Sequence, residues 1–258
     1  MTDQTRLVRI WSWRLNLARH GGHGDLASPD DEALLDHRER RRADGFVFPR
    51  DRRRFVTTHA TMRRILGQCV GAAPASLSFT VGNHGKPFLR HEPGWPALDF
   101  SLSHTDENAI LAVSLDGPVG IDIERIRPID VGLSWRYFAP EEIAFLDSHL
   151  GRSRQMTPAW QDAFFAIWTV KEAVLKALGR GLSMPLDSFA IALNPEPSLV
   201  RLDEAPDTVG DWQIETLETP DGIAGAIAFP SSGWRLRYEP LPPDGEDGTS
   251  ATSATAAP

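Results

Sequence analysis

The stretch FFAIWTVKEAVLKALGRGL, from Phe164 to Leu182, predicts the central helix of the fold. On a wheel of about 100° per residue, its large apolar side chains gather on one side, as in an amphipathic helix that contacts a core. These side chains are Phe164, Ile167, Trp168, Val174, Leu175 and Leu178. Gly179 follows the last apolar position and predicts the end of the helix.

Three charged residues lie within this stretch. Glu172 and Lys176 are four positions apart, so they share one face of the helix beside the apolar side. An ordinary ion pair between neighbouring turns is one interpretation of this spacing. Lys171 falls in the middle of the apolar side, where an ammonium group needs a partner or a route to water.

Length, composition and charge limit the function classes. The chain has 258 residues, of which 41% are hydrophobic, so it can form one large domain or two smaller ones with a sizeable core. The formal net charge of -8 argues against general nucleic-acid binding. Eight arginines nevertheless lie between Arg38 and Arg54, which predicts a local anion site on an acidic protein.

Cysteine content and hydropathy indicate the compartment. The single cysteine, Cys69, excludes an internal disulfide and has no metal-ligand spacing. No apolar run approaches ~18 residues, and no opening hydrophobic segment follows a basic start, so we expect neither a membrane span nor a signal peptide. The sequence therefore predicts a cytoplasmic protein.

Short alternating strands and a few helices account for most of the remaining chain. One helix is predicted to start at Pro29 and to continue through Arg42, and another to run from Asp51 to Leu66 with its end at Gly67. A third helix is predicted from Ala139 to about Leu150. Strands are predicted at 11–17, 77–81, 100–104, 109–114, 119–125, 189–193, 212–217, 223–229 and 234–238.

Two polar motifs follow strands in the first half of the chain. Gly85-Lys86-Pro87 predicts a turn with exposed backbone amides and one cation, which suits a nucleotide or phosphate, although an ordinary turn is the commoner interpretation. His104 ends a short strand directly after Ser103. A histidine in this place is more often a hydrogen-bonded structural residue than a ligand contact.

Asp122 and Glu124 form an acidic pair on a predicted strand. They alternate with Ile121 and Ile123, so both carboxylates leave the same face of the strand. Carboxylates this close repel each other unless a positive group lies between them, and hard oxygen ligands favour magnesium or manganese over zinc. A solvated strand face is the alternative, and Glu172 and Lys176 make it less attractive.

The chain also shows a weak internal similarity. Segments 52–67 and 164–179 are both predicted helices of sixteen residues that end in Leu-Gly and precede strands. Two such halves packed face to face would bring Arg54 and Lys86 of the first half opposite four charged residues of the second half. These four are Asp122, Glu124, Glu172 and Lys176. That arrangement would suit a ligand with several phosphates and a divalent cation.

Four motifs in order resemble the 4'-phosphopantetheinyl transferase superfamily: Gly85-Lys86-Pro87, Phe100 to His104, Gly120 to Glu124, and Trp168 to Lys176. The length is similar to that of the monomeric, surfactin-synthetase-activating branch, and the resemblance covers roughly residues 35 to 230. It implies an α+β fold, a pseudo-twofold pair of α/β subdomains that each pack a small, largely antiparallel sheet on a long helix. The expected divisions are an N-terminal subdomain at 1–117, a C-terminal subdomain at 118–240 and a disordered tail at 241–258.

The resemblance also implies a reaction. The family moves the phosphopantetheine arm of coenzyme A onto a serine of an apo acyl or peptidyl carrier protein, with magnesium, and leaves adenosine 3',5'-bisphosphate. Asp122, Glu124 and Glu172 match the metal-binding acids, Glu172 also matches the residue that takes the serine proton, and Lys176 matches the diphosphate-binding lysine. The expected catalytic residues are therefore Glu172, Lys176 and Asp122.

Other positions match contacts to coenzyme A. The N-terminal subdomain is expected to bind the 3'-phosphate and adenine, and the C-terminal subdomain the metal and the diphosphate. His104 and Arg54 match contacts to the 3'-phosphate, Ser103 lies beside them, Gly85-Lys86-Pro87 matches the segment against the adenine, and Arg42 stands where the family often has a basic phosphate ligand. We expect the ammonium of Lys171 to reach toward the acids or the ligand.

Two other functions share parts of this pattern. A magnesium-dependent nuclease or phosphodiesterase would also use acids and a lysine, but many such nucleases place the lysine two residues after an acid on a strand, and the negative charge suits duplex DNA poorly. A non-catalytic coenzyme A-binding module would not need Asp122, Glu124, Glu172 and Lys176 together. We therefore expect a monomeric enzyme that binds neither nucleic acid nor membrane.

Overall fold

The computed structural model describes residues 6–15, 27–150, 156–231 and 233–242, and the chain divides into two compact units. The first unit comprises Met1–Asn16, Phe79–His91 and Pro96–Glu239, and the second comprises Leu17–Ser78, Glu92–Trp95 and Pro240–Pro258. The two units are defined by compactness, whereas the predicted boundary between 117 and 118 separates two subdomains of similar fold. That boundary stays a prediction. Residues 16 and 17 of the strand predicted at 11–17, and residues 243–258 of the tail predicted at 241–258, lie outside the described residues.

Helices and mainly antiparallel sheets confirm the predicted α+β class, while the pseudo-twofold arrangement stays a prediction. The strands are β1 (Arg6–Arg14), β2 (Phe79–Val81), β3 (Pro87–Leu89), β4 (Asp99–Thr105), β5 (Asn108–Ser114), β6 (Gly120–Arg125), β7 (Phe189–Ala192), β8 (Ser198–Leu202), β9 (Trp212–Thr216), β10 (Ile223–Pro230) and β11 (Trp234–Tyr238). The α-helices are α1 (Pro29–Leu34), α2 (His37–Asp44), α3 (Pro49–Val70), α4 (Gly132–Tyr137), α5 (Pro140–Asp147) and α6 (Pro158–Leu178). Short 3-10 segments are η1 (Pro74–Ser76), η2 (Gly181–Ser183), η3 (Leu186–Ser188) and η4 (Pro206–Asp211).

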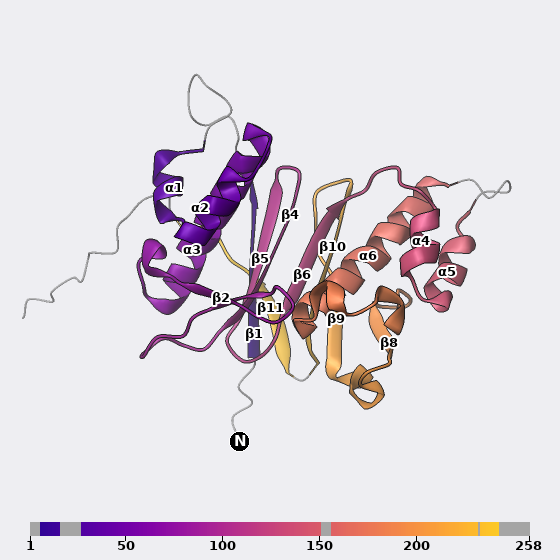
Figure 1. Cartoon of the computed structure of the whole chain (residues 1–258). Coiled ribbons are helices and arrows are strands. Elements are labelled where there is room, and N and C mark those ends of the chain that lie inside the picture. Colours follow the sequence, from indigo (N-terminus) through magenta and orange to yellow (C-terminus); the bar gives the residue numbers. More distant parts are fainter. Residues whose placement is uncertain (1–5, 16–26, 151–155, 232, 243–258) are drawn as a thin grey trace, which may run out of the picture. The chain divides into compact units, whose positions relative to one another are not determined.

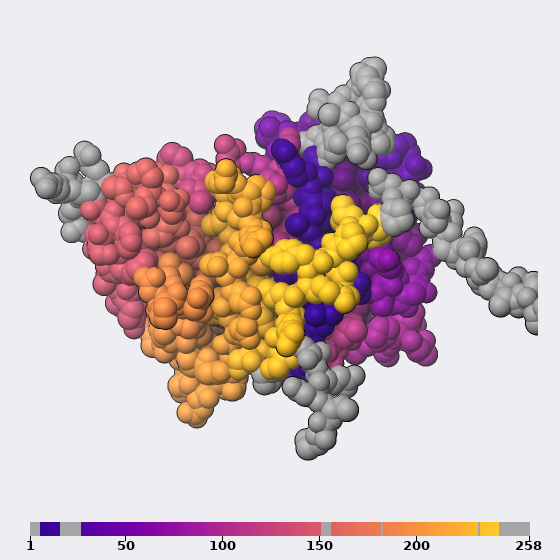
Figure 2. Space-filling model, turned by 180° about the vertical axis from the view of Figure 1, so that it is seen from behind, coloured from indigo at the N-terminus to yellow at the C-terminus, as the bar shows by residue number. Residues whose placement is uncertain are grey.

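Two sheets form the frame of the first unit (Figure 1). One has the strand order β11-β1-β5-β4 and the other the order β6-β10-β9. Neighbouring strands in them are antiparallel except β1 and β11, which are parallel. Figure 2 shows the yellow C-terminal segment against the indigo N-terminal strand. The sequence predicted β11 as a strand but not this partner, because a period of two identifies a strand and not its neighbour.

The two sheets meet where β4 and β6 lie side by side, and side-chain hydroxyls connect them there (Figure 1). The hydroxyls of Ser101, Ser103 and Thr105 accept hydrogen bonds from the backbone N–H groups of Ile121, Ile123 and Arg125, at 3.0, 3.2 and 3.1 Å. Donors and acceptors both recur every second residue, as facing strands require. These three hydroxyls, which we call the hydroxyl seam, fix β6 relative to β4.

Helix α6 packs directly on β6 and β10. The predicted end at Gly179 is confirmed, since this residue closes the helix in the left-handed conformation with φ 66°. At Gly120, an added Cβ would lie 1.9 Å from the carbonyl oxygen of Ala173 and 2.4 Å from the nitrogen of Ala177. Glycine at position 120 therefore lets the helix backbone approach β6 this closely.

We expect Gly120→Ala to destabilise the protein by about 3 kcal/mol or more, because the methyl group would meet helix backbone that cannot rotate away. The substitution should also lower activity, since it separates the charged residues of α6 from those of β6. Gly210→Ala is the matched control, because a Cβ there meets nothing within 4 Å. Denaturant unfolding measures both changes, and equal stability of the two variants would contradict the close approach of α6 to β6.

The second unit departs from the sequence predictions at two helix ends. The helix predicted from Pro29 through Arg42 is two helices, because Asp36 starts α2 with a capping box in which its side chain accepts from the backbone of Arg38 and Glu39. The end predicted at Gly67 is also wrong, since α3 continues to Val70 and Gly71 closes it with φ 70°. Gly67 serves close packing instead, because a Cβ there would lie 2.6 Å from the Ala72 carbonyl oxygen.

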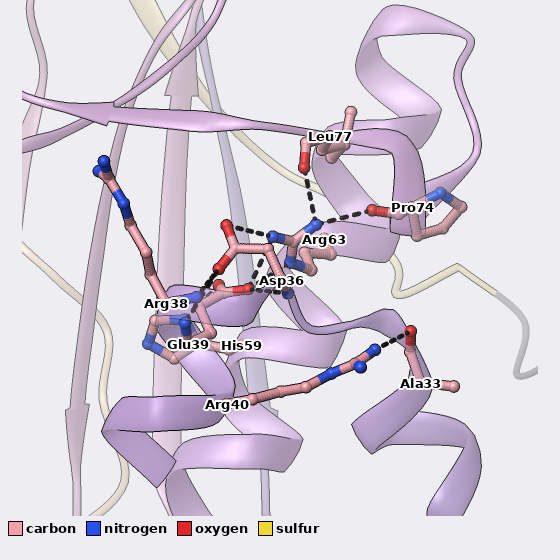
Figure 3. Close-up of polar contacts among 9 residues, drawn as sticks. All are labelled: Ala33, Asp36, Arg38, Glu39, Arg40, His59, Arg63, Pro74 and Leu77. Carbon is pink, nitrogen blue, oxygen red and sulfur yellow. Dashed lines mark hydrogen bonds and ion pairs between the residues drawn. The ribbon is translucent and has the colours of Figure 1, made fainter.

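A buried arginine connects the helices of the second unit (Figure 3). The guanidinium of Arg63 is fully buried and donates to Glu39 Oε2 at 2.7 Å and to the carbonyl oxygens of Pro74 and Leu77 at 3.1 and 3.0 Å. Burial alone would raise the pKa of Glu39, but hydrogen bonds and charge from His59 and Arg63 lower it. This arginine therefore stabilises the fold and does not belong to an anion site.

None of the helices in the described part of the chain is long and apolar enough to cross a membrane.

Candidate active site

The four charged residues predicted to carry the chemistry come from two neighbouring elements of the first unit. On β6, Ile121 and Ile123 are buried in the core, so Asp122 and Glu124 leave the opposite face, as predicted. Helix α6 supplies Glu172 and Lys176. The close packing of α6 on β6 brings these two pairs together.

Asp122 lies at the centre of this group. Its side chain is buried, and its Oδ1 accepts hydrogen bonds from Ser103 Oγ at 2.8 Å and from Lys176 Nζ at 2.7 Å. Lys176 also donates to the carbonyl oxygen of Ile121 at 3.0 Å. Lys176 thus pairs across to β6, so the ordinary interpretation of an ion pair with Glu172 is wrong. Among the described residues, Asp122 Oδ2 is buried without a hydrogen-bond partner.

The carboxylates of this group influence one another. Burial, followed by the charge of Asp122, raises the pKa of Glu172, and Lys176 partly opposes this shift. Burial and then Asp122 likewise raise the pKa of Glu124, with Arg127 and Lys176 opposing. The acids are therefore close enough to repel, which is the environment that favours binding of a cation.

The donor set suits a hard divalent cation, because it consists of carboxylate oxygens and includes one buried oxygen without a partner. In the described ranges, however, no three acidic, histidine or cysteine side chains already converge closely enough to enclose a metal ion. The ammonium of Lys176 supplies the positive charge beside Asp122 instead. The carboxylates of Asp122, Glu124 and Glu172 are therefore suitable ligands for a cation, but they are not yet arranged around one position.

The Gly-Lys-Pro motif forms the predicted turn, between β2 and β3, with Gly85 at φ 92°. The Lys86 ammonium donates to Asp99 Oδ2 at 2.5 Å and to the carbonyl oxygen of Val119 at 3.1 Å, and its side chain is nearly buried. Lys86 thus ties this turn to the residue before β6. Gly85 and Pro87 are exposed, and the contact of this segment with adenine stays a prediction.

The two motif residues at the end of β4 are placed differently. His104 is exposed, and its contact with a 3'-phosphate stays a prediction. Ser103 is buried, and its hydroxyl contacts Asp122 and the backbone of Ile123. The structure therefore places Ser103 beside an acid, and its place beside the 3'-phosphate contacts stays a prediction.

The arginine-rich segment belongs to the second unit, and some of its arginines pair with acids of that unit. Arg52 pairs with Glu32 and Asp44, and Arg64, which follows the segment on the same helix, pairs with Asp31. Arg54 lies 3.5 Å from Asp51, and its Nε has no hydrogen-bond partner among the described residues. Arg42 is exposed, and its guanidinium lies 5.3 Å from the centre of the Phe55 ring. The phosphate contacts predicted for Arg42 and Arg54 stay predictions.

Lys171 corrects one prediction, because its ammonium does not reach toward Asp122, Glu124 or Glu172. It is fully buried and donates to Glu142 Oε1 at 2.6 Å and to the carbonyl oxygen of Phe189 at 2.8 Å. Burial lowers its pKa to about 8, although Glu142 opposes the shift. Sequence patterns offered no signal for this pair, since Glu142 is an ordinary acid in the first turn of a distant helix.

The fold and the site together define a class: an α+β protein that carries one buried carboxylate, two half-buried carboxylates and one lysine, suited to a phosphorylated ligand. A family model described as the 4'-phosphopantetheinyl transferase superfamily matches residues 118–228, and one described as 4'-phosphopantetheinyl transferase, N-terminal, matches residues 31–116.

Curated relatives agree with these two models. The 4'-phosphopantetheinyl transferase HetI of Nostoc sp. is 35% identical over 212 residues, which cover 81% of this chain and 84% of HetI. The 4'-phosphopantetheinyl transferase Sfp of Bacillus subtilis is 30% identical over 224 residues, 80% of this chain and 95% of Sfp. The 4'-phosphopantetheinyl transferase gsp of Aneurinibacillus migulanus is 30% identical over 173 residues, 67% of this chain and 68% of gsp.

The chain belongs to the 4'-phosphopantetheinyl transferase superfamily. The resemblance seen in the four sequence motifs is thereby confirmed, and the protein is an enzyme that transfers the 4'-phosphopantetheinyl group of coenzyme A to a carrier protein.

Proposed function

We propose that this enzyme transfers phosphopantetheine with the help of magnesium and releases adenosine 3',5'-bisphosphate. The observation that carries the proposal is the buried Asp122 oxygen without a partner, beside Glu124, Glu172 and Lys176. Asp122, Glu124 and Glu172 would hold the cation, which is Mg²⁺ or Mn²⁺. When bound, the cation would neutralise charge on the diphosphate of coenzyme A.

The residues of this chain supply the other steps. Lys176 binds the diphosphate, for which it leaves its contact with Asp122. Glu172 takes the proton of the carrier serine, directly or through a water molecule, and the raised pKa of its half-buried carboxyl supports this role. The serine oxygen bonds to the phosphorus that carries the pantetheine arm. The bond from that phosphorus to the bridging oxygen breaks, and the electron pair leaves with adenosine 3',5'-bisphosphate.

The proposal assigns the rest of coenzyme A to predicted contacts. Arg54 and His104 bind the 3'-phosphate with Ser103 beside them, Gly85-Lys86-Pro87 lies against the adenine, and Arg42 is a further phosphate ligand. The two subdomains at 1–117 and 118–240 are supported by the two family models, which meet between residues 116 and 118. In the same proposal the enzyme is a cytoplasmic monomer that acts on apo acyl or peptidyl carrier proteins.

Metal removal and product analysis test this proposal. After treatment with a chelator, transfer should stop and should return with added Mg²⁺ or Mn²⁺. Chromatography should show one adenosine 3',5'-bisphosphate for each modified carrier. Undiminished transfer in excess chelator would overturn the role of the metal, and any other nucleotide product would overturn the proposed bond cleavage. Cleavage of nucleic acid by the same preparation would favour the nuclease alternative.

Arg54→Ala is expected to raise the KM for coenzyme A by about tenfold or more, because a charge-assisted hydrogen bond to a phosphate is worth about 1.5–3 kcal/mol. The KM for 3'-dephospho-coenzyme A should change much less, since that substrate lacks the phosphate. Arg64→Ala is the matched control on the same helix, because Arg64 pairs with Asp31. Equal effects of Arg54→Ala on the two substrates would contradict the assignment.

A further inference from the structure

The orientation of the Ser103 hydroxyl follows from its two partners. It accepts from the backbone N–H of Ile123 at 3.2 Å, and a backbone N–H can only donate. The hydroxyl hydrogen is therefore available for Asp122 Oδ1, at 2.8 Å. Ser103 is buried on β4, so the sheet fixes the position of its short side chain and therefore of this contact.

The other two hydroxyls of the seam lack this second function. Ser101 and Thr105 accept the N–H groups of Ile121 and Arg125 in the same way. Among these three described hydroxyls, the one of Ser103 contacts a carboxylate. Ser101 thus provides an internal comparison, because it makes the same seam contact and is similarly buried.

The two oxygens of Asp122 differ because of Ser103 and Lys176. Both donors contact Oδ1, while Oδ2 is buried without a partner among the described residues. A buried oxygen without a hydrogen-bond partner lowers the stability of the fold by about 1–3 kcal/mol, and a bound cation would offset this loss. In the proposed reaction Lys176 turns to the diphosphate, so the donor that then keeps Asp122 in place is Ser103.

We propose that Ser103 is a positioning residue for the cation site: its hydroxyl holds Oδ1 of Asp122 and so presents Oδ2 to the metal. This inference rests on the proposed function. It gives Ser103 a role beyond its expected place beside the 3'-phosphate contacts of coenzyme A. Residues that orient a metal ligand typically change metal affinity by about 10- to 100-fold when they are replaced.

The test compares Ser103→Ala with Ser101→Ala, and electron paramagnetic resonance measures Mn²⁺ binding in the presence of coenzyme A and without carrier. Each variant loses one seam hydrogen bond, and Ser103→Ala also loses the bond to Asp122, so thermal unfolding should show a somewhat larger loss of stability for Ser103→Ala. We expect Ser103→Ala to weaken Mn²⁺ binding by about tenfold or more and Ser101→Ala by less than about twofold. Ser103→Thr keeps a hydroxyl and should bind Mn²⁺ nearly as tightly as the wild-type enzyme.

Several outcomes would overturn the inference. Equal Mn²⁺ affinity of Ser103→Ala and Ser101→Ala, with a wild-type enzyme that binds Mn²⁺, would remove the role of Ser103 and leave the proposed function intact. A wild-type enzyme that transfers phosphopantetheine but binds no Mn²⁺ would overturn the proposed metal site as well. If Ser103→Ala does not fold, Ser103→Cys replaces it, because a thiol is a weak donor and should also weaken binding. Wild-type Mn²⁺ affinity in Ser103→Cys would then count against the proposal.

Discussion

Glu172→Gln is expected to lower the rate of phosphopantetheine transfer by about 10³-fold at saturating coenzyme A and carrier. A general base typically contributes about 10²- to 10⁴-fold, and the amide cannot accept the serine proton. The substitution also removes one of the carboxylates whose mutual repulsion favours a cation. Because glutamine has nearly the shape of glutamate and the side chain is half-buried, the fold should stay intact.

Steady-state rates and thermal unfolding together check this expectation. Glu141→Gln is the matched control, because Glu141 is an exposed acid on α5 that lies 3.5 Å from Arg201. Its rate should stay within about twofold of the wild-type rate, as expected for an exposed position away from the site. A Glu172→Gln variant with more than a tenth of the wild-type rate would exclude Glu172 as the base.

The second large effect concerns stability. Glu142→Leu is expected to lower the free energy of unfolding by about 3–5 kcal/mol, because it leaves a buried ammonium without its carboxylate. It also removes the acceptor for the backbone N–H groups of Ile191 and Ala139, each at 2.9 Å. Lys171→Met should cost less, about 1–3 kcal/mol, because Glu142 keeps these two donors. Denaturant unfolding at neutral pH measures the stability loss of both variants. A larger loss for Lys171→Met than for Glu142→Leu would contradict this interpretation of the pair.

The same pair predicts a pH dependence. Burial lowers the pKa of Lys171 to about 8, so between that value and the ordinary lysine pKa the unfolded chain holds this proton more tightly than the folded protein. The free energy of unfolding of the wild-type protein, relative to that of Lys171→Met, should therefore rise with pH above about 8. A constant difference over this interval would show that the Lys171 pKa is not lowered in the folded state.

Local patterns predicted the elements of the fold better than their partners. The α6 helix and the alternation of Ile121 and Ile123 with acids follow from periods of 3.6 and two residues, and both were confirmed. The break before α2 was missed because Asp36 was not recognised as a cap within a run of charged residues. The short strand β8 and the pairing of β11 with β1 were also missed, because neither depends on a local pattern.

The site was predictable where chemistry requires particular residues at a fixed spacing. Asp122, Glu172 and Lys176 were selected from spacing and from the resemblance, and the structure brings them together. The contact of Ser103 with Asp122 and the pair of Lys171 with Glu142 depend on tertiary packing, which one sequence does not display. The arginine-rich segment looked like one anion site, yet Arg52 and Arg54 pair with acids of their own unit.

The most direct test of the account is the intact mass of an apo carrier protein after incubation with coenzyme A, Mg²⁺ and this enzyme. A panel of carriers from fatty acid, polyketide and peptide synthetases should be used, since the sequence does not specify which are modified. At least one carrier should gain the mass of one phosphopantetheine with the wild-type enzyme and gain none with Glu172→Gln in the same time. Unchanged mass of every carrier with the wild-type enzyme, or equal modification by both enzymes, would contradict it.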